Sequence, residues 1–174
     1  MKENLPQRRR TRLQNYDYSL PGAYFVTVCT QQRREILSKI VGDGAPDVPK
    51  IELTETGRRV EKILLDSEKI PGVRIDRYVL MPDHLHVIIF LDPSVCAEKR
   101  GTSGAPSPTN EMLSRVISAF KRFCTKELGD NPFQRSFYDH IIRDRADYDE
   151  HIRYILENPM RRYFREKANE KSPL

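Results

Sequence analysis

Residues 80–90, LMPDHLHVIIF, are the stretch from which the fold and the candidate site of this chain can be inferred. The second half of this stretch is apolar and rich in β-branched side chains, which is typical of a buried strand. Because successive side chains of a strand point to opposite faces, His84 and His86 share one face and the apolar residues between and after them share the other. The stretch therefore predicts a strand that turns one face to a core and carries two imidazoles on the opposite face.

Two imidazoles side by side on a rigid strand suit a divalent metal, because neutral imidazole nitrogens are good ligands and the strand fixes their spacing. A pair of hydrogen-bonded histidines at a strand end is the structural alternative. Other enzymes with a His-x-His motif are also open: a histidine-triad hydrolase would have a third histidine where this chain has Ile88. Nothing in the spacing selects a 2-His-1-carboxylate oxygenase.

The composition fits one domain with a nucleic-acid partner. The chain has 174 residues, 38% of them hydrophobic and 32% charged, and a net charge of +5. A basic balance favours a polyanionic partner, with nucleic acid the leading candidate.

The three cysteines, Cys29, Cys96 and Cys124, have no CxxC spacing, which argues against a disulfide framework and a four-cysteine zinc site. A reducing, cytoplasmic location is therefore expected.

No membrane segment is expected. Residues 1–6 lack the apolar region of a signal peptide, and the longest apolar run, residues 87–91, is too short to span a bilayer.

Residues 1–20 are expected to form a basic arm. Its arginines are candidate phosphate contacts or simply solvated charges, and they are Arg8, Arg9, Arg10 and Arg12.

Hydrophobic periodicity predicts alternating strands and helices. Strands are expected at 24–30, 36–41, 51–53, 73–80, 84–90 and 133–143, and helices at 54–70, 110–128 and from 144 to 157 or 158. Residues 92–110 are rich in Pro, Gly and Ser and predict a mobile loop, and residues 164–174 predict a frayed tail. All of these parts are expected to belong to a single domain, 1–174.

The helix at 110–128 has an apolar face and a basic face. The expected core positions are Met112, Val116, Phe120, Phe123 and Cys124. On the other face, Lys121 and Arg122 are candidate DNA contacts, with an ordinary solvated face as the alternative. Arg135 and Arg143, at the ends of the last strand, are candidates for phosphate contacts or for surface ion pairs.

The last helix contributes Tyr154 and Asn158, which lie four residues apart and therefore on one helix face. They flank its apolar stripe, at the border between core and solvent. A tyrosine in such a position is often a packing residue with a hydrated hydroxyl. His151, one turn before Tyr154, and His140 are further imidazoles that could lie near a site or simply be hydrogen-bonded.

An ordered set of motifs resembles one known family, the HUH single-tyrosine transposases, and within it the REP-associated tyrosine transposases. The segments that carry the resemblance are PGAYFVT (21–27), YVLMPDHLH (78–86), QRSFYDHIIRD (134–144), DY (147–148) and YILENP (154–159). The resemblance covers residues 8–163. The chain departs from the family pattern at Asp83, where Asn is often found, and at Phe133, where Trp is common.

The resemblance implies an α+β fold, with a ferredoxin-like or palm-like antiparallel sheet and helices packed on one face. It also implies a metal-dependent transposase that cleaves and rejoins single-stranded, hairpin-associated DNA through a 5′-phosphotyrosine intermediate. By that resemblance, Tyr154 is the nucleophile, and His84, His86 and Asn158 hold Mg²⁺ or Mn²⁺. Both a homodimer and a monomer are compatible with it. A domesticated relative that binds DNA without catalysis is the alternative.

Overall fold

The computed structural model describes residues 20–42, 49–95 and 109–170. The strands are β1 (Gly22–Cys29), β2 (Ser38–Val41), β3 (Lys50–Leu53), β4 (Val73–Met81), β5 (His84–Leu91) and β6 (Tyr138–Ile142). The helices are α1 (Glu55–Asp66), α3 (Thr109–Leu128) and α4 (Arg145–Glu170), with short 3₁₀ turns η1 (Gln31–Arg33) and η2 (Ser67–Lys69). The four arginines of the basic arm and most of the loop at 92–110 lie outside the described residues.

The main sheet has four strands in the order β4-β5-β1-β6, and every neighbouring pair is antiparallel. The chain alternates β1, α1, β4, β5, α3 and β6, which is the ferredoxin-like order of elements. Strands β2 and β3 form a separate two-stranded sheet. The expected α+β fold around an antiparallel sheet is therefore confirmed.

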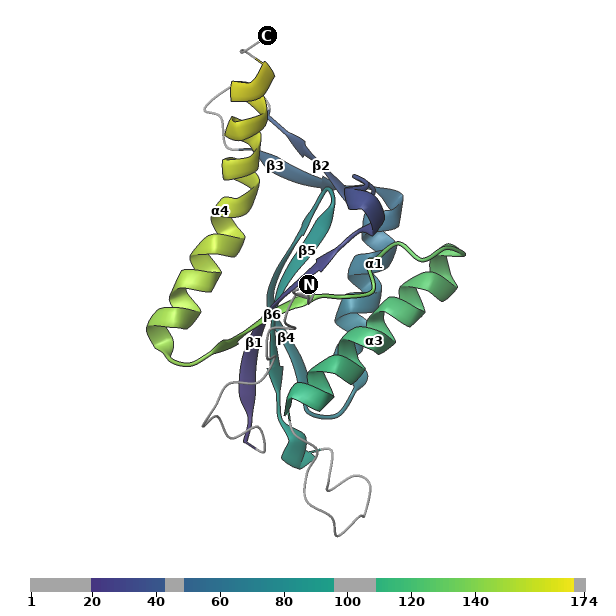
Figure 1. Ribbon diagram of the computed structural model, residues 1–174, viewed down its shortest axis with the longest axis vertical. Helices are drawn as coiled ribbons and strands as arrows, with labels where there is room; N and C mark the ends of the chain where they lie inside the picture. Colours follow the sequence, from purple (N-terminus) through teal and green to yellow (C-terminus); the bar gives the residue numbers. More distant parts are fainter. Residues whose placement is uncertain (1–19, 43–48, 96–108, 171–174) are drawn as a thin grey trace, which may run out of the picture.

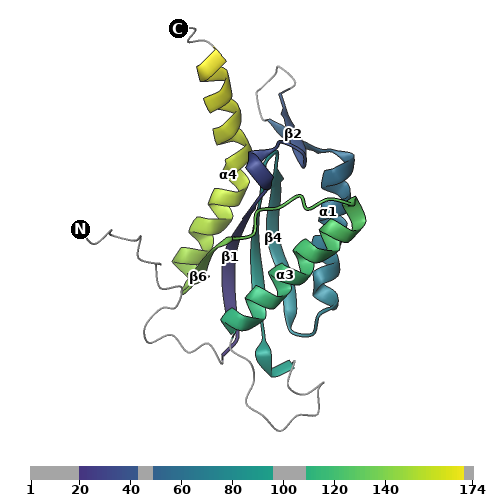
Figure 2. The same ribbon diagram turned by 45° about the vertical axis from the view of Figure 1, so that its right-hand side comes forward.

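Helices cover both faces of the main sheet. Helices α1 and α3 lie on one side and α4 on the other (Figures 1 and 2). The prediction that all helices pack on one face was therefore wrong for α4. The reason lies in the sheet, because its second face is also partly apolar: Ile88, Ile142 and Ile155 form a small buried cluster between the sheet and α4. Such a face needs its own cover.

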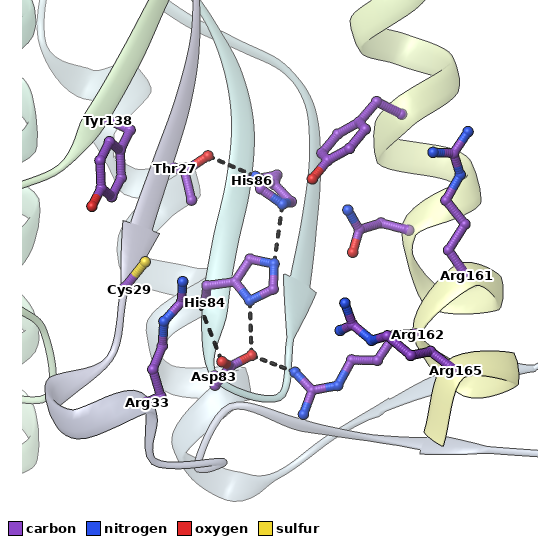
Figure 3. A pocket seen from close by; sticks show the side chains of 12 residues that line it. Thr27, Cys29, Arg33, Asp83, His84, His86, Tyr138, Arg161, Arg162 and Arg165 are labelled. Atoms are coloured by element: carbon purple, nitrogen blue, oxygen red, sulfur yellow. Dashed lines mark hydrogen bonds and ion pairs between the residues drawn. The ribbon is translucent and has the colours of Figure 1, made fainter. Parts of the chain in front are cut away.

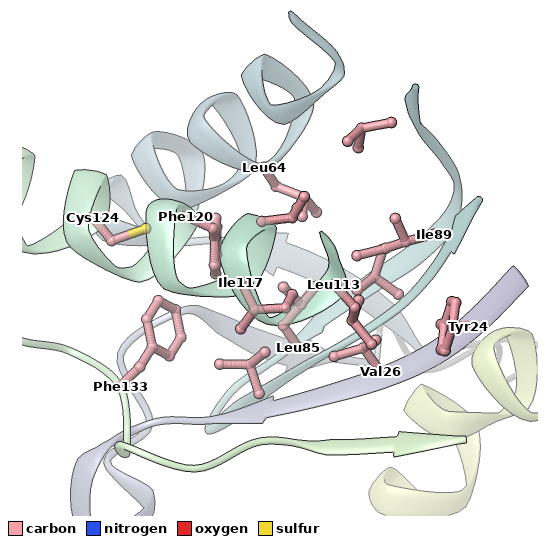
Figure 4. Close-up of a cluster of buried hydrophobic side chains, with 14 of the residues drawn as sticks. Tyr24, Val26, Leu64, Leu85, Ile89, Leu113, Ile117, Phe120, Cys124 and Phe133 are labelled. Carbon is pink, nitrogen blue, oxygen red and sulfur yellow. The ribbon is translucent and has the colours of Figure 1, made fainter. Parts of the chain in front are cut away.

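The main core lies between the sheet and the α1–α3 layer (Figure 4). The predicted apolar face of β5 points into it, and Leu85, Val87 and Ile89 are fully buried. Phe120 is buried as expected, but Phe123 is 51% exposed, so its assignment to the core was wrong. The buried stripe of α3 continues from Phe120 to Cys124, one turn on, and Phe123 lies beside this stripe.

Helix α4 is longer than predicted, because it continues through Pro159 to Glu170 instead of ending at 157 or 158. Proline lacks an N–H group and costs the helix a hydrogen bond, which is why an end was expected there. Tertiary contacts offset this cost, since Arg162 and Tyr163 beyond the proline are both buried. The first part of the tail that was expected to fray is therefore helical.

Within the described residues, no helix combines the length and the apolar character needed to cross a bilayer. Cys29 and Cys124 are buried free thiols.

Candidate active site

The two histidines begin β5 directly after a tight hairpin. Met81 of β4 pairs with His84 of β5, so Pro82 and Asp83 form the turn between the strands. The turn is anchored by its carbonyl groups: the Leu37 N–H donates to Pro82 O at 3.0 Å, and the Thr30 N–H donates to Asp83 O at 3.0 Å. The backbone that carries the histidines is therefore held on both sides of the turn.

The imidazoles of His84 and His86 face each other on the α4 side of the sheet (Figure 3). Their Nε2 atoms are 3.0 Å apart. The other nitrogen of each ring is held, His84 Nδ1 by Asp83 Oδ1 at 2.8 Å and His86 Nδ1 by Thr27 Oγ1 at 2.8 Å. Such second contacts orient metal-binding histidines. Neighbouring ligands of an octahedral dication at about 2.1 Å lie about 3.0 Å apart, so the donor set fits a divalent metal.

Burial keeps His86 neutral. The residue is 5% exposed, and burial is the main cause that lowers the pKa of His86 to about 3, with smaller contributions from the neighbouring His84 and Arg33. Burial alone would raise the pKa of Asp83, but the hydrogen bond and charge of His84 and the charge of Arg162 outweigh it and hold that pKa below its usual value. His86 is therefore a neutral imidazole, and Asp83 stays an ionised carboxylate. Both features suit the binding of a cation.

Tyr154 and Asn158 lie in the same cavity as the histidines, a cleft of about 610 Å³ between the sheet and α4. The Tyr154 ring lies edge-on to the ring of His86, with 5.1 Å between the ring centroids. It is also edge-on to the ring of Phe25, with 5.8 Å between the centroids. The side chain is 39% exposed, so its hydroxyl is accessible. The structure thus brings together all four residues that the sequence singled out for metal binding and nucleophilic attack.

Two other tyrosines, Tyr148 and Tyr138, have to be compared with Tyr154 as candidate nucleophiles. The Tyr148 hydroxyl donates to Asp76 Oδ2 at 2.5 Å, and this hydrogen bond raises the pKa of Tyr148, which makes it a poorer nucleophile. Tyr138 lines the cavity and is 68% exposed. Tyr138 is therefore the tyrosine against which Tyr154 has to be tested.

One wall of the cavity is cationic, which the sequence analysis did not anticipate. It is formed by Arg161, Arg162 and Arg165 of α4, and Arg33 lines the cavity from the other side of Asp83 (Figure 3). The three arginines of α4 follow Tyr154 and Asn158 at helical spacing, so a signal was present in the sequence. The arginines were not predicted to line the site, because the helix was expected to end before Pro159.

Arg33 reaches the cavity through a backbone conformation that side chains rarely adopt. Gln32 and Arg33 are consecutive residues with φ of 53° and 56°. Left-handed geometry costs roughly 1–2 kcal/mol for a residue other than glycine, and it persists at sites that use it. In this conformation the Arg33 guanidinium donates a hydrogen bond to Asp83 Oδ2 at 3.2 Å. The strained turn therefore places a positive charge next to the histidine pair.

The other predicted DNA contacts lie elsewhere. The Lys121 ammonium donates to the backbone carbonyls of Gln134, Arg135 and Ser136 at 2.8–3.2 Å, and burial lowers the pKa of Lys121 to about 8. It therefore has a structural task in holding the segment before β6. Exposed side chains are found at Arg122, Arg135 and Arg143, none of which lines the cavity of the histidine pair.

Comparisons with known proteins give three informative matches. No protein-family model matches the chain. It is 30% identical over 165 residues to an uncharacterised protein of Haemophilus influenzae, and the match covers 88% of each chain. It is 26% identical over 145 residues to a REP-associated tyrosine transposase of Escherichia coli, with 83% of this chain and 70% of the relative covered.

The third match is a solved structure, a REP-associated tyrosine transposase bound to a REP hairpin. The two chains superpose with a TM-score of 0.58 at 21% identity, over 87% of this chain and 74% of the other. At this identity the likeness establishes the shared fold. The chain therefore belongs to one family with its Haemophilus relative, and it is similar in sequence and in fold to REP-associated tyrosine transposases.

Proposed function

We propose that the chain is a metal-dependent transposase that cleaves and rejoins single-stranded DNA, with Tyr154 as its nucleophile. The observation that carries the proposal is the meeting of Tyr154 with the His84–His86 pair in one cavity, although some 70 residues separate them in the sequence. A chance packing of these residues would not also line the cavity with arginines.

The chemistry is a phosphoryl transfer. The Tyr154 oxygen attacks a backbone phosphorus of the DNA and loses its proton. The bond from phosphorus to the 3′ oxygen of the leaving strand breaks, and that oxygen takes up a proton. The product is a 5′-phosphotyrosine bond and a free 3′ hydroxyl. Because the phosphodiester energy is conserved, a DNA hydroxyl can reverse the step and join a new end without ATP.

His84, His86 and Asn158 would hold the metal, Mg²⁺ or Mn²⁺. A bound dication would supply charge stabilisation to the phosphate under attack. The chain's own residues have separate tasks. Thr27 and Asp83 orient the two imidazoles, and α4 carries the nucleophile to them.

The proposed substrate is single-stranded DNA beside a hairpin. The solved relative was captured on a REP hairpin. In this chain the more exposed cavity arginines, Arg33, Arg161 and Arg165, suit the phosphates of a DNA backbone. One chain contains all the proposed site residues, so the reaction does not require a second copy, and either a monomer or a homodimer can carry it out. We also propose a single domain over 1–174 and a cytoplasmic location.

The test is covalent capture. The protein is incubated with Mg²⁺ and labelled single-stranded DNA that contains the hairpin repeats flanking its own gene, and adducts are resolved on a denaturing gel. The wild type is expected to form an adduct, and Tyr154→Phe is expected to form none. Tyr138→Phe is the matched control because it removes the other exposed hydroxyl of the same cavity, and it should retain the adduct.

Three other results of this experiment would contradict the proposal. An adduct that survives Tyr154→Phe and disappears with Tyr138→Phe would move the nucleophile to β6. DNA binding without any adduct would identify a binding protein that has lost its chemistry. Cleavage without an adduct would indicate a hydrolytic phosphoesterase with the same histidine pair.

A further inference from the structure

A second group of metal-binding side chains lies beside the candidate active site. His140 is on β6, and Asp147 and His151 are in the first two turns of α4. One ligand atom from each of the three lies within 4.8 Å of the others. The register of the sheet pairs His140 with Phe25 of β1, so this group lies on the α4 face, on the opposite side of β1 from the His84–His86 pair on β5.

Both imidazoles of this group converge on one carboxylate. His140 Nε2 is 2.9 Å from Asp147 Oδ2, and His151 Nδ1 is 3.1 Å from Asp147 Oδ1. The two rings are stacked, with centroids 4.6 Å apart and 20° between their planes. The side chain of His140 is 42% exposed, whereas Asp147 and His151 are 18% and 17% exposed. The group is thus half-buried but open to solvent on the His140 side.

We propose that His140, Asp147 and His151 form a second metal site, which takes a transition-metal dication of the Zn²⁺ class. Two imidazoles and a carboxylate suit Zn²⁺, whereas Mg²⁺ prefers oxygen ligands. Ligand atoms around a tetrahedral Zn²⁺ lie about 3.3–3.5 Å apart, so small side-chain rotations bring the three atoms to that spacing. His140 Nε2 now donates to the carboxylate, and His151 Nδ1 donates to the Asp147 backbone carbonyl at 2.8 Å. On binding, each of these protons moves to the other nitrogen of its ring by exchange with water, and the freed lone pair coordinates the cation.

The site would add a cross-link between two elements that a short turn and the contact of Ile142 with Ile155 already join. His140 belongs to the edge strand of the sheet, and Asp147 and His151 belong to the start of α4. The ring of Phe25 lies 4.6 Å from His151 and 5.8 Å from Tyr154. A cation here would fix the beginning of α4 and, through it, the tyrosine; only this last consequence rests on the proposed function.

Hydrogen bonds alone give the alternative. Asp147 Oδ2 also accepts the backbone N–H of Arg143 at 3.0 Å, so the carboxylate has a capping task without any metal. In that case His140 is only a further donor to the carboxylate, and His151 Nδ1 donates to the backbone carbonyl of Asp147 at 2.8 Å. Metal binding therefore has to be measured directly and apart from the His84–His86 pair.

The experiment uses the full chain with His84→Ala and His86→Ala, which removes the imidazoles of the first site. After chelation and buffer exchange, Zn²⁺ is titrated against a chromophoric chelator, and Co²⁺ is added separately to record its visible absorption. We expect one Zn²⁺ per chain. A further His140→Phe change, which keeps a ring against His151, should weaken binding more than about 100-fold, since even the loss of an outer contact costs 10–100-fold.

Asp147→Asn should weaken binding in the same way, and Asp149→Asn is its matched control. Both changes remove one carboxylate from the start of α4, but Asp149 pairs with exposed Arg145 and not with the histidines. No Zn²⁺ binding in the double-alanine chain, or binding that His140→Phe leaves unchanged, would overturn the proposal. If the double-alanine chain does not fold, His140→Phe is compared with wild type, and the Zn²⁺ stoichiometry must fall by one.

Discussion

Asp83 is the residue through which the turn, the histidine pair and the end of α4 are connected. Its carboxylate accepts hydrogen bonds from His84 and from the guanidinium groups of Arg33 and Arg162. An asparagine, expected here from the family pattern, has one acceptor oxygen and would present an N–H₂ group to one of these donors. The carboxylate at 83 and the buried arginine at 162 therefore form a matched pair in this chain.

The pKa of His86 predicts how the metal-free chain responds to acid. In the unfolded chain an ordinary histidine binds a proton below about 6.5, whereas His86 in the fold stays neutral down to about 3. Between these values the unfolded state holds more protons, so stability falls as the pH falls. With chelator present, His86→Gln should reduce the loss of unfolding free energy between pH 7 and pH 4 by about 2–3 kcal/mol.

Chemical denaturation at a series of pH values measures this difference. His86→Gln keeps a polar group for Thr27 but cannot titrate. If the acid limb of the stability profile is equally steep in both proteins, burial of a neutral His86 is not the cause of the acid sensitivity.

Substitutions of the neighbouring residues Arg161 and Arg162 are expected to change the free energy of unfolding by different amounts. Its guanidinium is buried and pairs with Asp83, Glu35 and Glu166, so Arg162→Met leaves a half-buried carboxylate at 83 with fewer partners. We expect a loss of about 3 kcal/mol of unfolding free energy. Arg161→Met removes only an exposed pair with Glu157 and should change stability by less than about 0.5 kcal/mol. Urea denaturation compares the two, and equal effects would contradict the structural role of Arg162.

At the scale of elements, α4 decides how the site is assembled. One face of this helix presents Tyr154, Asn158 and the arginines at 161, 162 and 165 to the cavity. The same helix packs Ile155 against the sheet. The order of Tyr154 and the cationic residues along the cavity therefore follows from helical periodicity once the helix continues past Pro159.

Helix α3 offers a test of the packing. Phe120 is 1% exposed and packs against Phe133, with 5.4 Å between the ring centroids, whereas Phe123 is 51% exposed. Phe120→Ala should destabilise the fold by about 3–5 kcal/mol, because it removes a buried ring and leaves a cavity. Phe123→Ala, the same change one turn away, should cost less than about 1 kcal/mol. Thermal or urea unfolding measures both, and a comparable cost for Phe123 would place it in the core after all.

At the scale of the whole molecule, the two faces of the main sheet carry different kinds of residues. The face toward α1 and α3 carries most of the core, and the face toward α4 carries both groups of histidines and the cationic wall. Substitutions on the second face can therefore change DNA binding while the main core stays intact.

The salt dependence of DNA binding tests this division. Each phosphate contact to single-stranded DNA contributes about 0.7 to the slope of log K against log salt. Arg165→Ala, on the cavity wall, should lower the slope by about that amount. Arg59→Ala removes the same charge from α1, where it pairs with Glu55, and should leave the slope unchanged. Fluorescence anisotropy at several salt concentrations measures both, and identical slopes for wild type and Arg165→Ala would exclude that arginine as a phosphate contact.

Local signals were sufficient for the strands and for the histidine pair. Alternation along 84–90 predicted both the apolar face and the shared face of His84 and His86, because the period of a strand is a local property of the chain. The spacing of Tyr154 and Asn158 likewise follows from a single helix. The prediction of an α+β antiparallel sheet rested on such patterns together with the family resemblance.

Only the tertiary structure decided which segments meet. Whether α4 ends at Pro159 depends on contacts with Asp83 and Glu35, which lie far away in the sequence and offset the lost hydrogen bond. The same long-range contacts bring Arg33 and Arg162 to the histidine pair. The face of the sheet that α4 covers, and the meeting of His140 with His151, are also set by packing between distant segments, which the local sequence does not encode.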